Sequence, residues 1–206
     1  MQGIELIFSI AVLIFSVIVH ELAHGYTADY LGDPTARLAG RLTWNPLSHL
    51  DAVGSLLVPL FSYTLGGFVF GWAKPVPYNP YNLRNQKWGT ALVAVSGAAA
   101  NLLIALFFSL VIRYKEALSI SSPSFIEIAG VVIFLNILLA VFNLIPIPPL
   151  DGSKVLFSIL PHRFGFIQEF LEKYSLVLII FLIFFLWRFF IPLVYFLYSL
   201  FTGAWF

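Results

Sequence analysis

The stretch HELAH, residues 20–24, follows an apolar run that is almost unbroken from Ile4 to Val19. Two histidines and a glutamate therefore stand near the end of a segment with the length and composition of a membrane-spanning helix. Ionisable groups are costly to bury in a membrane, so those found there are usually functional and share a partner. These residues predict a helix that crosses a bilayer and carries a polar site within it.

The apolar run also has some features of a secretory signal peptide. It lacks, however, a basic region before it and a cleavage site with small residues after it. Cleavage behind the run would also fall beside HELAH. We therefore interpret the run as a helix that the protein keeps.

The composition of the chain indicates an integral membrane protein in contact with a lipid bilayer. Of its 206 residues, 60% are hydrophobic and only 10% are charged, whereas soluble domains carry about 25% charged residues. The formal net charge of +1 gives no reason to expect a nucleic-acid partner. The chain contains no cysteine, which excludes disulfide bonds and thiolate metal ligands.

Four apolar segments are long enough to cross a membrane, for which about 18 residues suffice. They are Ile4–Tyr26, Thr90–Arg113, Phe125–Pro146 and Leu176–Phe201. Pro192 lies inside the last segment, which is either one span or two shorter helices that meet at this proline. We expect an all-α polytopic membrane protein with about four transmembrane helices and a re-entrant or hairpin segment near 53–70, which Pro59 interrupts.

The spacing of the two histidines in HELAH is typical of a metal site. Four residues apart on a helix, His20 and His24 lie on one face and can bind a single divalent metal ion. Glu21 stands beside them, where it can accept a proton from a metal-bound water. The alternative interpretation is a helix end at the membrane interface, with its polar groups hydrated.

A catalytic zinc ion takes three protein ligands, so a third ligand must come from elsewhere. The metzincin motif would place glycine and histidine at positions 27 and 30, which are Thr27 and Tyr30. The remaining candidates are Asp29, Asp33, Asp51, Asp151, His49 and His162. We favour Asp151, because the prolines of NLIPIPPLDG (143–152) end a hydrophobic helix there and let a carboxylate point inward. Its alternative role is that of a turn residue or helix N-cap.

Three motifs together resemble the site-2 protease family of intramembrane zinc metalloproteases. They are HELAH at 20–24, SGAAAN at 96–101 and NLIPIPPLDG at 143–152. The resemblance implies one zinc ion per chain, with His20, His24 and Asp151 as its ligands and Glu21 as the general base. It covers about residues 4–155, and we expect the short form of the family, without a PDZ domain.

The resemblance also implies roles for three further polar or small residues. Asn143 is expected to contact the substrate or to stabilise the oxyanion, although an amide that packs between helices is the alternative. Gly97 and Asn101 are expected to support close packing of the central helix, because small residues let membrane helices approach one another.

We expect residues 1–206 to form a single membrane-embedded metalloprotease domain, with the catalytic core at about 4–155 and an interfacial and transmembrane segment at 156–206. The resemblance implies hydrolysis of peptide bonds in or near transmembrane segments of membrane proteins. Two other classes stay open, a metal-ion transporter and a catalytically silent membrane scaffold. The sequence does not indicate an oligomeric state.

The shared site constrains the topology. HELAH lies near the end of its helix and Asp151 lies past the end of another, so both ends must be on one side of the membrane. Thr90–Arg113 leaves that side and Phe125–Pro146 returns to it, so the segment near 53–70 should not cross. Most basic residues then fall on the side of the site: Arg37, Arg41, Lys74, Arg84, Lys87, Lys154, Arg163 and Lys173. The positive-inside rule predicts a site near the cytoplasmic side of the cell membrane.

Overall fold

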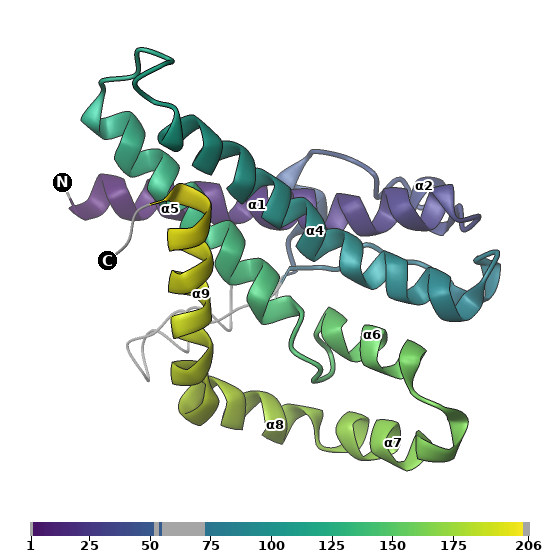
Figure 1. Cartoon of the computed structure of the whole chain (residues 1–206). Coiled ribbons are helices and arrows are strands. Elements are labelled where there is room, and N and C mark those ends of the chain that lie inside the picture. The colour runs from purple at the N-terminus through teal and green to yellow at the C-terminus, as the bar shows by residue number, and fades with distance from the viewer. Residues whose placement is uncertain (1, 52–53, 55–72, 204–206) are drawn as a thin grey trace.

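The computed structural model describes residues 2–51, 54 and 73–203, and all regular secondary structure in these ranges is helical (Figure 1). Three of the helices described are long and apolar enough to cross a membrane, or four spans if one bent pair counts as a span. The three long helices are α1 (Gln2–Tyr30), α4 (Gln86–Arg113) and α5 (Pro123–Asn143). The expectation of a helical, multi-pass membrane protein is thereby confirmed.

Local sequence signals set the ends of these helices. α4 begins after Asn85, whose side chain accepts a hydrogen bond from the backbone N–H of Trp88. α5 begins after Ser122, which caps it in the same way, and has Pro123 in its first turn. α1 continues past the predicted end to Tyr30, because no proline or helix-breaking glycine pair follows HELAH before that point.

The core of the molecule forms where α4 packs between α1 and α5. The buried face of α4 is made largely of small residues: Gly89, Ala91, Ala94, Gly97, Ala98 and Ala105. Small side chains allow helix backbones to approach closely, which is how helices associate in a membrane without a strong hydrophobic driving force. Gly97 and Asn101, for which a packing role is expected, both lie on this buried face.

After α5 the chain forms a series of shorter helices. They are α6 (Asp151–Ile159), α7 (Gly165–Lys173), α8 (Ser175–Phe181), a π-helical turn (Leu182–Leu186) and α9 (Trp187–Thr202). Four further short helices are α2 (Thr35–Leu38), η1 (Pro46–His49), η3 (Pro80–Asn82) and η4 (His162–Phe164). Figure 1 shows α9 running across α5, with α8 and α7 leading into it.

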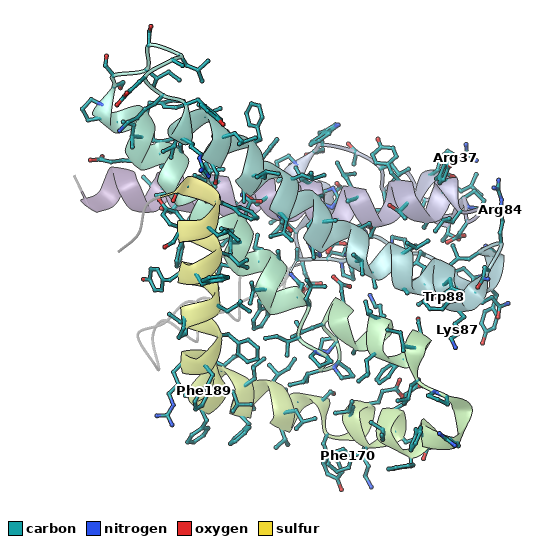
Figure 2. All side chains as sticks on the ribbon, in the orientation of Figure 1. Arg37, Arg84, Lys87, Trp88, Phe170 and Phe189 are labelled. Atoms are coloured by element: carbon teal, nitrogen blue, oxygen red, sulfur yellow. The ribbon has the colours of Figure 1, made fainter. Side chains whose placement is uncertain are left out.

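The last apolar segment is bent, but not at its proline. The axes on either side of the bend differ by 67°, and the bend follows the wide turn Leu182–Leu186. Pro192 lies inside α9 and does not break it, so of the two alternatives the one with two helices meeting at this proline is not found. Insertion of a π turn is a known cause of sharp helix bends. Arg188 is exposed and lies 5.0 Å from the ring centre of Phe189, which Figure 2 labels at this corner.

The C-terminal end of α1 and the N-terminal end of α4 lie at the same end of the bundle. The backbone N–H of Arg84 donates a hydrogen bond to the carbonyl of Leu31 at 3.0 Å. The chain therefore returns, before α4, to the place where α1 ended, which agrees with the topology deduced from the sequence. The re-entrant or hairpin segment predicted near 53–70 lies outside the described residues.

Asp33 links two segments of the chain at this end of the bundle by hydrogen bonds. Its side chain is fully buried and accepts hydrogen bonds from the hydroxyl of Thr35, the backbone N–H of Asn79 and the side-chain amide of Asn82. Burial would raise the pKa of Asp33, but these hydrogen bonds to the carboxylate lower the pKa below its usual value. The ionised carboxylate thus joins the end of α1 to the segment that precedes α4.

Because the pKa of Asp33 is lower in the folded state, its ionised form stabilises the protein at neutral pH, and this contribution disappears as the pH falls below about 4. We expect Asp33→Asn to lower the melting temperature at pH 7, with a smaller difference from wild type at acidic pH. Thermal unfolding in detergent across this range measures both effects, with Asp29→Asn as the partly exposed control. A difference that stays constant with pH would contradict the assignment.

Candidate metal centre

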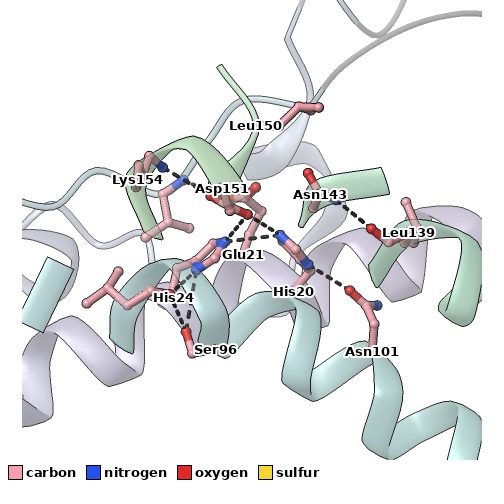
Figure 3. A network of polar contacts seen from close by, with 12 residues as sticks. His20, Glu21, His24, Ser96, Asn101, Leu139, Asn143, Leu150, Asp151 and Lys154 are labelled. Atoms are coloured by element: carbon pink, nitrogen blue, oxygen red, sulfur yellow. Dashed lines mark hydrogen bonds and ion pairs between the residues drawn. The ribbon is translucent and has the colours of Figure 1, made fainter. Parts of the chain in front are cut away.

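Three side chains from two distant parts of the chain converge inside the bundle (Figure 3). His20 and His24 come from α1, and Asp151 is the first residue of α6, 131 residues after His20. Asp151 Oδ2 lies 3.0 Å from the Nε2 atom of each histidine, and the two Nε2 atoms are 3.0 Å apart. All three residues are buried, and each offers a ligand atom to a common point.

A chain of amides fixes the orientation of His20. Asn101 accepts from Nδ1 of His20 at 2.7 Å, and its own amide nitrogen donates to the backbone carbonyl of Ser16 and to Oδ1 of Asn136. Because a carbonyl only accepts, this pattern sets the direction of the Asn101 amide and requires a proton on Nδ1 of His20. Nε2 is then left with a free lone pair that faces Asp151.

His24 is held in the same tautomer by α4. Its Nδ1 lies 2.6 Å from the backbone carbonyl of Val93, which can only accept, so Nδ1 carries the proton. Ser96 Oγ lies 3.4 Å from the same nitrogen and donates to the same carbonyl. Hydrogen bonds of this kind from the outer nitrogen are typical of histidines that bind metal through Nε2.

The resulting arrangement suits a bound cation. Two imidazole lone pairs and a carboxylate oxygen face one another at 3.0 Å, and three electron-rich atoms without a positive charge between them would repel. Ligand atoms around a tetrahedral zinc ion at about 2.0 Å are spaced by about 3.3 Å, close to the distances found. Among the residues that the structure describes, these three form the one such group, and Asp29, Asp33, Asp51 and His49 lie outside it.

Gly97 is required by the position of the His20 ring. A Cβ atom at this position would lie 2.6 Å from both Cε1 and Nε2 of His20, far closer than a carbon contact allows. The glycine expected for helix packing therefore packs against a candidate ligand itself.

We accordingly expect Gly97→Ala to displace the His20 ring and to weaken metal binding by at least about tenfold, the lower end of the losses seen when the support of a ligand is disturbed. Zinc affinity can be measured by competition with a chromophoric chelator. Gly165→Ala is the control, because a Cβ there has no neighbour within 4 Å. Equal zinc affinity for Gly97→Ala and wild type would contradict the close approach.

A cavity of about 130 Å³ opens beside the three side chains. Its lining residues are His20, Glu21, His24, Pro75, Val76, Tyr78, Asn143, Pro149, Asp151 and Lys154. Glu21 faces this cavity, and its Oε2 accepts a hydrogen bond from the backbone N–H of Val76 at 2.7 Å. Asn143 also borders the cavity, while its amide nitrogen donates to the carbonyl of Leu139, one turn back along α5. Both residues thus border the same cavity as the three candidate ligands.

Sequence reasoning missed several residues that support the site. Asn136 and the hydroxyl of Ser16 extend the hydrogen-bond network behind His20. Asn136 could have been found from the sequence, since a lone amide in an otherwise apolar span usually has a hydrogen-bond partner. Nothing in the sequence marked Val76, because it acts through its backbone N–H. Lys154 contacts Asp151, but from the sequence it was used only as one of the basic residues that indicate the cytoplasmic side.

Three convergent side chains that could hold a metal ion, beside a glutamate and inside a bundle of membrane-spanning helices, are features of a membrane-embedded metallopeptidase. Residues 8–122 and 116–186 match the model of Peptidase family M50. The chain belongs to this family, which confirms the resemblance to the site-2 proteases.

Two relatives show the same relationship. Over 154 residues the chain is 38% identical to the Bacillus subtilis protein named "Putative zinc metalloprotease YwhC", covering 72% of this chain and 67% of the relative. Over 148 residues it is 33% identical to "Putative zinc metalloprotease Rip2" of Mycolicibacterium smegmatis, covering 71% of this chain but only 55% of that protein. No solved structure was found to match the chain.

Proposed function

We propose that this M50 peptidase is a zinc metalloendopeptidase that hydrolyses peptide bonds in or near the transmembrane segments of membrane proteins. The convergence of His20, His24 and Asp151 beside Glu21, within the membrane-spanning bundle, carries the proposal. We further propose that residues 1–206 act as one membrane-embedded unit.

In this proposal His20, His24 and Asp151 hold one zinc ion per chain. Bound zinc would polarise the scissile carbonyl and acidify a water molecule, bringing the pKa of that water to about 7. The donor set fits zinc, since imidazole nitrogen and carboxylate oxygen are both ordinary zinc ligands. Asn101 and the carbonyl of Val93 act behind the ligands, where they hold a proton on Nδ1 of each histidine and leave Nε2 turned toward the ion.

Glu21 is the proposed general base. It takes a proton from the attacking water and passes that proton to the amine as the C–N bond breaks. The backbone N–H of Val76 binds one carboxylate oxygen, which orients the side chain and leaves the other oxygen for the water. Asn143 borders the cavity, and we propose that it contacts the substrate backbone.

The depth of the site determines what the substrate must do. His20 precedes the end of α1 at Tyr30 by ten residues, or about 15 Å along the helix. A peptide bond cleaved there must enter from the membrane or its interface. A helical substrate hides its carbonyls in intrahelical hydrogen bonds, so it must unwind locally before attack.

The positive-inside rule supports a cytoplasmic orientation of this end. Figure 2 shows Arg37, Arg84, Lys87 and Trp88 projecting from the end of the bundle where α1 ends and α4 begins. Basic side chains favour the cytoplasmic side, and tryptophan favours the membrane interface. The proposed zinc centre would then lie inside the membrane, nearer its cytoplasmic face.

Reconstitution tests the proposal. The purified protein, loaded with zinc in liposomes, should cleave a co-reconstituted single-span substrate, and a chelator should stop cleavage until zinc is restored. A transporter would instead move zinc across the liposome without cleavage, and it would leave Glu21 without a role. A scaffold would do neither.

A further inference from the structure

Lys154 lies next to the proposed zinc ligand from α6. It follows Asp151 by three residues, so the two side chains share one face of the helix. The Nζ atom of Lys154 lies 3.1 Å from Oδ1 of Asp151, whereas the two histidines contact Oδ2. The two oxygens of one carboxylate are thus divided between the candidate metal position and an ammonium group.

The same ammonium group borders the cavity. The Lys154 side chain is 38% exposed, and Nζ lies 5.6 Å from the ring centre of Tyr78, another lining residue. Among the described residues that line this cavity, Lys154 is the only lysine or arginine, and it faces the same space as Glu21. An ammonium group has three N–H donors, so the bond to Asp151 leaves others for a ligand.

This position suits a group that meets developing negative charge. When water adds to a peptide carbonyl, a C–O bond forms, the carbonyl electron pair moves to oxygen, and Glu21 receives the proton. Collapse of the adduct restores the carbonyl, breaks the C–N bond and returns the proton to the amine. A fixed cation near the oxygen stabilises the adduct more than the substrate, which is the condition for a faster reaction.

We propose that Lys154 is a further catalytic residue: it donates a hydrogen bond to the oxyanion at the scissile carbonyl, while its bond to Asp151 restricts that carboxylate to one metal-binding oxygen. The assignment rests on the proposed peptidase function. The proposed role is electrostatic, so the reaction takes no proton from Lys154.

The test compares Lys154→Met and Lys154→Arg with the wild type and with Lys173→Met, whose side chain lies on α7, away from the cavity. Three quantities are measured in the zinc-loaded protein: zinc per chain, kcat and KM for the single-span substrate, and inhibition by a phosphinic peptide, which mimics the tetrahedral anion. We expect Lys154→Met to keep its zinc and its KM but to lose about 10²- to 10³-fold in kcat. Phosphinate inhibition should weaken in proportion, and arginine should restore part of both.

Two results would overturn the assignment of Lys154 alone. The first is a kcat of wild-type size in Lys154→Met. The second is a fall in kcat that marks a structural role. Such a fall would either leave the phosphinate affinity unchanged or be fully explained by a loss of zinc. Absence of cleavage by the wild type would instead overturn the proposed function, and this assignment with it.

Discussion

Replacing Glu21 by glutamine is expected to lower kcat by about 10²- to 10⁴-fold, the usual contribution of a general base. Glutamine keeps the size of the side chain and an oxygen that can accept from the N–H of Val76, so the local structure should persist. What it loses is the ability to take a proton from water. The measurement is cleavage of the reconstituted substrate together with zinc content, which should stay at one ion per chain.

Glu169→Gln serves as the matched control, because Glu169 is an exposed residue of α7 outside the cavity. Turnover close to wild type in Glu21→Gln would exclude Glu21 as the base. A loss of zinc together with turnover would show instead that the glutamate supports the metal centre.

Replacing Asp151 by alanine is expected to cost the protein its zinc. The substitution removes one of three proposed ligands, so affinity should fall by more than the factor of about 10 to 100 typical of residues that only support a ligand. It also leaves two neutral imidazoles from α1 with no partner on α6. Metal analysis of the purified protein measures the loss directly.

Asp29→Ala is the control for this experiment, because Asp29 lies on the same helix as the two histidines but outside the group of three. Full zinc content in Asp151→Ala would show that the ion is bound without the second motif. The sequence pattern at 143–152 would then need a different explanation.

The spans were predictable because length and hydropathy alone decide them. The predicted segments at 90–113 and 125–146 correspond to α4 and α5 to within a few residues. The bend before α9 was not predictable, because Leu182–Leu186 reads as uniformly apolar and no proline or glycine marks it. Leu182, at the start of this turn, is fully buried in a cluster with Ile145 and Leu150, contacts that the local sequence does not reveal.

The candidate site was predictable to the extent that its residues carry chemistry in their side chains. The spacing within HELAH and the prolines before Asp151 led to the group that the structure brings together. The network behind His20 depends on which faces of α1, α4 and α5 meet, and no single helix contains that information. The partner of Glu21 is a backbone N–H, which every residue except proline could supply.

The distance along the chain between His20 and Asp151 has a consequence for the protein's biogenesis. Translation proceeds at about 5 to 20 residues per second, so the 131 residues between them take roughly 7 to 26 seconds to synthesise. During that interval the nascent chain holds both histidines and the glutamate but lacks the carboxylate from α6. Under the proposed ligand set, a nascent chain that ends before Asp151 lacks one ligand, so we expect it neither to hold the ion nor to cleave neighbouring proteins until α6 has been made.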